Sequence, residues 1–320
     1  MSSKSNDQGR AFELACLIEI ENIIRKQRKT GNVAIERNSS YDAANRAWNN
    51  TYKYFRDTIQ KAAAAMADKL TALEPIMTEN DTELITLQIQ KDEEGEKGDV
   101  RDILIIRGES GWEIGLSVKH NHFAVKHSRL SPSIDFGDKW YGIPCSQTYW
   151  NAVNPIFSYL KDEKQKKTKW SDLPNKEGDV YVPLLSAFME EIKIANKTDP
   201  SFPKRMVEYL LGEYDFYKVI SVDSKKTTNI QSFNLRGTLN QASKTRTPEI
   251  SIPIAELPDE LVAIKMKKGS NNTVELYLNN GWQFSFRIHN ASTNVENSLK
   301  FDVQFTGMPT EIVLIACQWN

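Results

Sequence analysis

The chain has 320 residues, of which 40% are hydrophobic, so it is long enough for one large or two ordinary domains with a sizeable core. Its 41 basic and 42 acidic side chains give a net charge of -1, which excludes a strongly basic or acidic protein, so that any nucleic-acid-binding surface must be local. Cys16, Cys145 and Cys317 form neither a disulfide framework nor a zinc-ligand spacing, which favours a reducing cytoplasm. The sequence shows no apolar run long enough to span a bilayer and no signal peptide.

The first quarter of the chain has the pattern of helices followed by a strand. Apolar residues at helical spacing predict an amphipathic helix over residues 7–29 and a second, long helix over about 41–73, which Pro75 ends. Apolar residues then alternate over 84–89, which predicts a half-buried strand.

A predicted hairpin comes next and is the most informative stretch of the chain. Residues 98–106 and 112–121 predict two strands joined by a tight turn at 107–111. Asp102 stands at the start of the first strand and Lys119 at the end of the second, so an antiparallel pairing places them side by side. A carboxylate and a lysine in this arrangement, beside basic residues, could bind a divalent metal and a phosphodiester.

The remainder of the chain divides into a helical and a β-rich part. Residues 145–212 are mostly helical in pattern, with a lysine-rich segment at 161–169 that is either a solvated helix face or a contact to phosphates, and 214–222 predict a strand. We place a boundary near residue 225, which gives an α/β part over 1–224 and a β-rich part over 225–320. The strands predicted in the second part cover 273–278, 283–288, 301–305 and 312–316.

Several blocks of the sequence resemble the HaeIII family of type II restriction endonucleases, which falls in the PD-(D/E)XK nuclease superfamily. The superfamily motif (an acidic residue, a hairpin and a residue-x-Lys triplet) is short, whereas the matching block around Lys119 is long and specific. The resemblance extends over most of the chain. The blocks that carry it are residues 6–13, 95–102, 113–131, 180–185 and 286–291.

The resemblance implies a fold, an activity and partners. The expected fold is α/β: a PD-(D/E)XK core whose mixed central sheet, from residues 84–119 and 214–222, is flanked by helices, with the β-rich C-terminal part supplying much of the DNA recognition. The expected activity is Mg2+-dependent hydrolysis of double-stranded DNA at GGCC. A palindromic target favours a homodimer. A cognate DNA methyltransferase is expected to act in the same system without a stable complex.

The resemblance also assigns the catalytic positions. Asp102 is expected to bind the metal together with the backbone carbonyl of Val118, while Lys119 stabilises charge on the phosphate and helps to deprotonate the attacking water. The chain departs from the superfamily pattern at Ser117, where the family pattern has an acidic residue two positions before the lysine. A hydroxyl is a poor ligand for a hard cation, so another carboxylate must take its place.

Three carboxylates are candidates for that place. Glu13 is favoured as a metal ligand and catalytic residue because Gly9-x-x-Phe12-Glu13 matches a helix that, in many relatives, points a glutamate into the metal site. Asp99 is the alternative, or an outer residue of the site. Glu113 lies on the right face of its strand, but six strand residues span about 20 Å, which is too far from Lys119.

Polar residues after Lys119 and after the strand at 283–288 are the expected DNA contacts. Clustered histidines also permit a zinc site, although no known ligand spacing is complete, and a merely exposed polar turn is the structural alternative. Arg287 is a candidate for reading guanine, against a purely structural role at a strand end. The expected DNA-binding residues are His120, Asn121, His122, Lys126, His127, Arg129, Arg287, His289 and Asn290.

Two other functions remain open from the sequence. A non-catalytic DNA-binding protein could retain the nuclease fold, and Ser117 is the feature that supports this alternative; a plasmid digest with and without magnesium separates the two. A carbohydrate-binding β-sandwich joined to a helical domain would explain the C-terminal strands, but it leaves the arrangement of Asp102 and Lys119 unexplained.

Overall fold

The computed structural model describes residues 2–91, 93, 95 and 98–320, and the other residues of the predicted block 95–102, Glu96 and Lys97, lie outside them. The chain forms two compact units, each built from separate segments of the sequence. Unit 1 contains Met1–Phe123, Glu213–Ala255 and Thr310–Asn320, and unit 2 contains Ala124–Gly212 and Glu256–Pro309.

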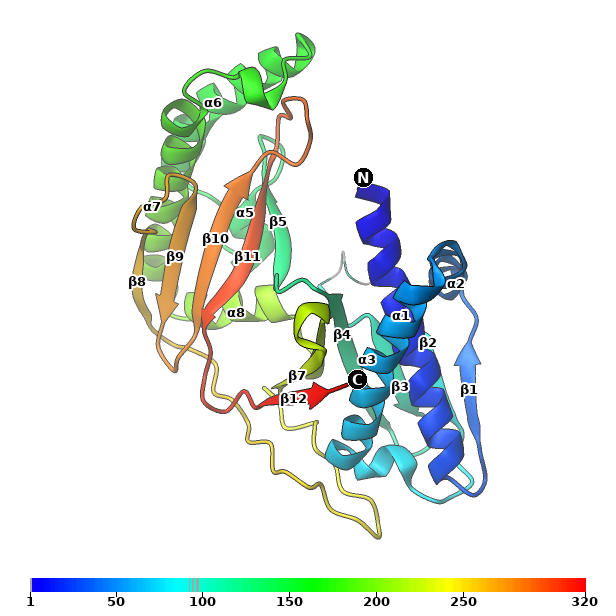
Figure 1. The fold of residues 1–320 in the computed structure, drawn as a ribbon. Helices are drawn as coiled ribbons and strands as arrows, with labels where there is room; N and C mark the ends of the chain where they lie inside the picture. Colours follow the sequence, from blue (N-terminus) through cyan, green and yellow to red (C-terminus); the bar gives the residue numbers. More distant parts are fainter. Residues whose placement is uncertain (1, 92, 94, 96–97) are drawn as a thin grey trace. The chain divides into compact units, whose positions relative to one another are not determined.

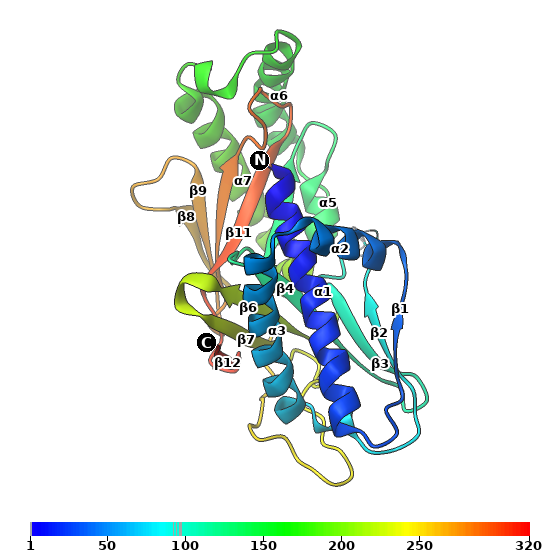
Figure 2. The same cartoon turned by 45° about the vertical axis from the view of Figure 1, so that its right-hand side comes forward.

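Unit 1 is a mixed sheet covered by helices. Its 7 strands lie in the order β1-β2-β3-β4-β6-β7-β12, in which β1/β2 and β4/β6 are parallel and the other neighbours antiparallel. Figures 1 and 2 show α1 and α3 side by side across this sheet. The elements are α1 (Ser2–Gln27), β1 (Val33–Glu36), α2 (Ser39–Asn50), α3 (Lys53–Leu73), β2 (Ile85–Ile89), β3 (Ile103–Arg107), β4 (Trp112–His120), β6 (Phe216–Val222), β7 (Thr227–Phe233) and β12 (Leu314–Gln318), with 3-10 turns at Pro75–Thr78 and Asp223–Lys225.

The α/β fold expected for the N-terminal part is therefore confirmed at the level of a mixed sheet with helices. Phe12, Cys16 and Ile20 of α1 are fully buried, and they belong to the same core as Ile105 of β3 and Ile114 of β4. The predicted apolar stripe of the first helix is thus the stripe that packs on the sheet, and this packing fixes where the helix begins relative to the strand ends.

The single long helix expected over 41–73 is wrong, because the structure has two helices with a break at residues 51–52. Asn38 caps α2 through its side chain, which accepts from the Tyr41 amide at 2.9 Å. At the other end Thr51 is extended, and its hydroxyl donates to the Trp48 carbonyl at 2.8 Å. Capping by a β-branched residue, which favours extended backbone, ends the helix although the apolar spacing continues.

Unit 2 is an antiparallel sheet with helices. Its 5 strands lie in the order β5-β11-β10-β9-β8. Phe286 of β10 and Phe301 of β11 pack in an aromatic cluster with Trp140 of α5 and Phe188 of α7. The elements are β5 (Lys126–Leu130), α5 (Phe136–Tyr141), α6 (Gln147–Gln165), α7 (Val182–Thr198), α8 (Phe202–Leu211), β8 (Leu261–Met266), β9 (Thr273–Leu278), β10 (Gln283–His289) and β11 (Leu299–Gly307), with a 3-10 turn at Trp170–Asp172 and a π-helical turn at Glu177–Tyr181.

The two units differ from the division expected at residue 225. Strands β7 and β12 follow that position in the sequence, yet they complete the sheet of unit 1, because β7 pairs with β6 and β12 pairs with β7. Strand β5 precedes it, yet it pairs with β11 in unit 2. The two units depend on which distant strands pair with each other. The boundary at residue 225 was predicted from a change in composition along the chain, and composition does not reveal such pairing.

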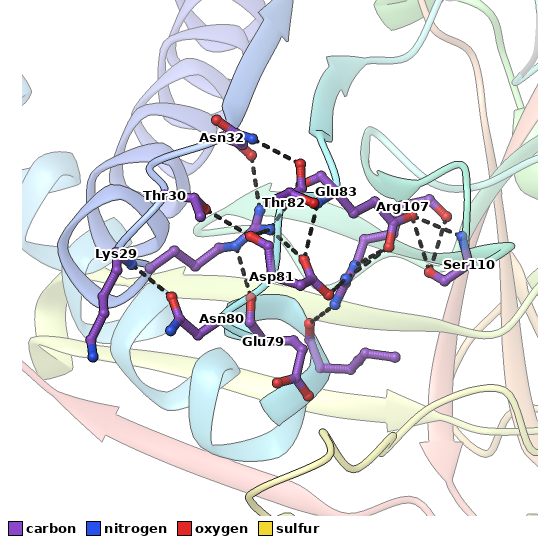
Figure 3. Close-up of polar contacts among 12 residues, drawn as sticks. Lys29, Thr30, Asn32, Glu79, Asn80, Asp81, Thr82, Glu83, Arg107 and Ser110 are labelled. Atoms are coloured by element: carbon purple, nitrogen blue, oxygen red, sulfur yellow. Dashed lines mark hydrogen bonds and ion pairs between the residues drawn. The ribbon is translucent and has the colours of Figure 1, made fainter.

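A buried polar network holds the end of the hairpin that lies away from Asp102. Arg107 of β3 donates to Glu83 at 2.7 Å and forms a short ion pair with Asp81, while Glu83 accepts from the Ser110 amide at 2.8 Å (Figure 3). Arg28 at the end of α1 also donates to Asp81, at 2.7 Å. Both guanidinium groups are buried, so the carboxylates of Asp81 and Glu83 compensate for the hydrogen bonds to water that they lose. Because Asp81 bonds to Arg28 and to Arg107, it links the end of α1 to the hairpin.

Among the described residues, the model contains no helix that is both long and apolar enough to cross a membrane.

Candidate active site

Asp102 is fixed by its backbone just before β3. Its amide donates to the Leu116 carbonyl of β4 at 2.7 Å, and its carbonyl accepts from the Gln90 amide at 2.9 Å. The Asp102 backbone therefore joins strands on both sides, although the residue precedes the strand itself. An anchored backbone leaves the carboxylate with little freedom, which a metal ligand requires.

The side chains of Asp102 and Lys119 are in contact, as the hairpin predicted. Lys119 Nζ lies 2.9 Å from Asp102 Oδ2, which also accepts from the Val118 amide at 2.6 Å and from the Ser117 hydroxyl at 3.4 Å. Oδ1 of Asp102 takes part in none of these three bonds. Both side chains remain about a quarter exposed, with 30% of Lys119 and 25% of Asp102 accessible, so a substrate can reach them.

Burial and two nearby carboxylates act in opposite directions on the pKa of Lys119. Burial by itself would lower the pKa of Lys119, but the charge and hydrogen bond of Asp102, with the charge of Glu13, outweigh it and hold the pKa above its ordinary value. Lys119 is therefore a cation in the absence of substrate. The influence of Glu13 on this amine shows that α1 brings a second carboxylate to the same place.

A polar cleft of about 370 Å³ joins Glu13 and Asp102. Its lining includes Asn6, Arg10 and Glu13 from the first turns of α1, together with Asp99 and Asp102 before β3. The carboxylates of Glu13 and Asp102 are the kind of ligand that Mg2+ prefers, and the basic side chains Arg10, Lys91 and Arg101 line the same cleft. The residues present thus fit a hard divalent cation, with Glu13 and Asp102 as the carboxylates.

Asp99, the alternative to Glu13, is committed to an arginine. Arg101 donates to both oxygens of Asp99, at 2.9 Å and 2.8 Å, and to Glu113 at 2.6 Å. The guanidinium also lies 3.9 Å from the centre of the Tyr214 ring. Burial would raise the pKa of Asp99, but the bonds from Arg101 outweigh it and keep the pKa low. Asp99 and Glu113 therefore orient Arg101, the residue next to Asp102.

Ser117 has a lysine beside it on the neighbouring strand. Lys218 of β6 is the register partner of Ser117, is 4% exposed and donates to the Phe123 carbonyl at 3.2 Å. Burial and the charge of Lys119 lower the pKa of Lys218 to about 7. A single lysine within the mostly apolar strand predicted over 214–222 was the sequence signal for this residue.

The expected DNA contacts of unit 1 follow Lys119 directly. His120 is largely buried, and its Nε2 lies 2.9 Å from Asp223 Oδ2, while Phe12 and Phe55 pack edge-on against the imidazole. Asn121 has a positive φ of 51° and contacts the same carboxylate at 3.2 Å. His122 is exposed. His120 and Asn121 therefore brace the end of β4 through Asp223, while Asn121 and His122 are both exposed at the surface.

Four of the six expected DNA contacts in unit 2 lie on one face of its sheet. His127, Arg129, Arg287 and His289 lie on the polar face of the five-stranded sheet, where their register partners are Asp302 or Lys300 of β11.

Lys126 and Asn290 are held by the fold of unit 2. Lys126 donates to the Tyr209 carbonyl at 2.6 Å, and burial lowers its pKa to about 8. Asn290 donates to the carbonyls of Ser292 and Asn294 and so shapes the loop after β10.

Sequence comparison decides the family. The sequence model of the HaeIII restriction endonuclease family matches residues 9–309. The chain is also 52% identical to the type II restriction enzyme HaeIII of Haemophilus aegyptius over 321 residues, which covers 100% of both chains. This chain belongs to the HaeIII restriction endonuclease family. It is accordingly a type II restriction endonuclease, and the family decides against the non-catalytic and carbohydrate-binding alternatives.

The comparison with solved structures gives no match. Two basic residues of this HaeIII-family enzyme, Arg101 and Lys300, were not predicted from the sequence to be important. Arg101 stands between two acidic residues in the sequence, and this spacing was the signal for its ion pair. The strand predicted over 301–305 begins two residues earlier, at Leu299, so Lys300 lies within it.

Proposed function

We propose that this enzyme cleaves double-stranded DNA at GGCC with Mg2+, through an active site made of Asp102, Lys119 and Glu13 in a PD-(D/E)XK core. The observation that carries the proposal is the 2.9 Å contact between Lys119 and Asp102, with Glu13 in the cleft that Asp102 lines. The target sequence and the metal come from the family resemblance.

The chain's own residues would divide the work as follows. Asp102 and Glu13, with the backbone carbonyl of Val118, would hold the metal, which supplies charge neutralisation at the phosphate and a more acidic water when bound. Lys119 would bring its positive charge close to a phosphate oxygen, on which negative charge develops in the transition state. The bonds that Asp102 Oδ2 receives from Val118 and Lys119 keep both catalytic groups in one orientation.

The enzyme would act as a homodimer in a reducing cytoplasm, alongside a cognate DNA methyltransferase. Each strand of a palindromic site needs one active site, so a two-fold homodimer is the economical arrangement. A cognate DNA methyltransferase would protect the host DNA without forming a stable complex. The three cysteines are all buried and free, which agrees with a reducing cytoplasm.

The test is a digest of two DNA fragments that differ only in one GGCC site, with and without Mg2+. Wild type should cut the fragment with the site only when Mg2+ is present. The Lys119→Gln variant should bind the site but not cut, whereas Lys197→Gln, an exposed lysine on α7, should cut like wild type. Cutting by Lys119→Gln at the wild-type rate would refute the proposed active site.

A further inference from the structure

Three basic side chains form one row across the polar face of the unit 2 sheet. Lys300 of β11 is the register partner of Arg129 on β5 and of His289 on β10. Strands are spaced about 4.8 Å apart and paired side chains lie on the same face, so the three reach the same strip of surface. We call Arg129, Lys300 and His289 the basic row.

The next row along the strands contains an acidic side chain, Asp302, which is already paired. Asp302 forms an ion pair with Arg287 at 2.9 Å and lies 3.2 Å from His127 Nδ1. Within the described parts of the chain, no carboxylate forms an ion pair with any member of the basic row. Arg129 instead donates to the Ser298 hydroxyl at 3.2 Å, and His289 Nδ1 lies 3.1 Å from the Asn290 carbonyl.

Like charges that face each other directly across strands destabilise a sheet. Burial and the positive charge of Arg129 lower the pKa of Lys300, and the negative charge of Asp302 in the next row offsets only part of this effect. The row is therefore a place where the folded protein holds positive charge at a cost, and a bound anion would remove that cost. The fold does not require three basic residues at these positions, because an acidic residue at one of them would pair with its basic neighbours and relieve the repulsion.

We propose that the basic row binds a phosphodiester of the DNA backbone. This inference rests on the proposed function, because it takes DNA as the ligand. A phosphate offers several oxygens to converging donors, and an arginine with a lysine is the common pair for such contacts. Arg287 has a different role in this arrangement, because Asp302 orients its guanidinium outside the row.

The experiment measures the salt dependence of DNA binding without Mg2+, by fluorescence anisotropy over about 50 to 200 mM salt. The slope of log affinity against log salt is negative, and Lys300→Gln should reduce its magnitude by about 0.9, the value for one phosphate contact. Lys300→Arg should restore the wild-type slope. Lys265→Gln is the matched control, because Lys265 lies on edge strand β8 of the same sheet, 4.8 Å from the Tyr277 ring, and its slope should equal that of wild type.

The ratio of affinities for target and scrambled DNA supplies the second readout. The ratio should stay unchanged in Lys300→Gln, since a phosphate contact carries no sequence information. An unchanged slope in Lys300→Gln would overturn the inference. If the ratio of affinities also fell, Lys300 would be reading bases and not a phosphate. If wild type cuts its target and Lys300→Gln keeps the full slope, only the role of the basic row is refuted. If wild type cuts no DNA with Mg2+, the proposed function itself is refuted.

Discussion

Replacing Gly115 with alanine should reduce both stability and cleavage, because the side chain of Arg101 occupies the space that a methyl group would need. A Cβ at Gly115 would lie 2.1 Å from Cδ and 2.6 Å from Cγ of Arg101. These atoms belong to the stem of a side chain whose head is fixed by Asp99 and Glu113, so the stem cannot swing away without breaking ion pairs.

Two routes could relieve the clash, and their costs decide the outcome. Breaking the pair between Arg101 and Asp99, whose side chains are 6% and 12% exposed, would cost about 3–5 kcal/mol. Shifting the backbone around the new methyl group costs about 1–3 kcal/mol, as overpacking generally does. The shift is cheaper, so Arg101 should stay paired while the hairpin moves. Asp102 follows Arg101 directly, and a displacement of about 1 Å at a catalytic group costs roughly 100-fold in rate.

The assay combines thermal unfolding with steady-state cleavage of a DNA fragment that carries the target. Gly108→Ala is the matched control, because a Cβ at Gly108 of the same hairpin meets nothing within 4 Å. In an Arg101→Ala background, Gly115→Ala should have a smaller effect, since Cγ and Cδ are gone and only the Cβ at 2.9 Å remains, and a double-mutant cycle measures this coupling. Equal unfolding temperatures and rates for Gly115→Ala and Gly108→Ala would refute the reasoning.

Three further predictions follow from the same site and from one buried acid. Asp102→Asn should abolish Mg2+-dependent cleavage, while Glu113→Gln, whose side chain is 37% exposed, should keep much of it; the reverse order in a cleavage assay would contradict the strand register. Glu13→Gln should shift the Mg2+ dependence and lower the rate by orders of magnitude without unfolding the protein, and superimposable Mg2+ titrations would reduce Glu13 to a surface charge. Burial raises the pKa of Glu74 from 4.5 to about 7, so the folded protein keeps a proton that the unfolded chain releases. Stability should therefore fall as pH rises through that window, and denaturant unfolding of wild type and Glu74→Gln should show the slope in wild type only.

Local pattern determined the parts of this protein that depend on neighbouring residues. The hairpin was predictable because two apolar runs and a short turn fix an antiparallel register, and Gly111 supplies the positive φ of 68° that the turn requires. That register alone brings Lys119 to Asp102. The first helix was predictable in the same way, because its apolar stripe is continuous. The resemblance then gave Glu13 a role that helical spacing by itself could not assign.

Tertiary structure alone decided the features that depend on distant segments. A threonine cap divides the long helical pattern at Thr51, and apolar periodicity does not report caps. Strands β5, β7 and β12 join sheets far from their place in the sequence, because strand pairing satisfies backbone groups wherever a partner edge is available. The same long-range pairing places Lys218 beside Ser117 and Lys300 beside Arg129. The sequence of the hairpin therefore placed Lys119 beside Asp102, and strand pairing between distant segments decided which charged side chains lie next to one another on the two sheets.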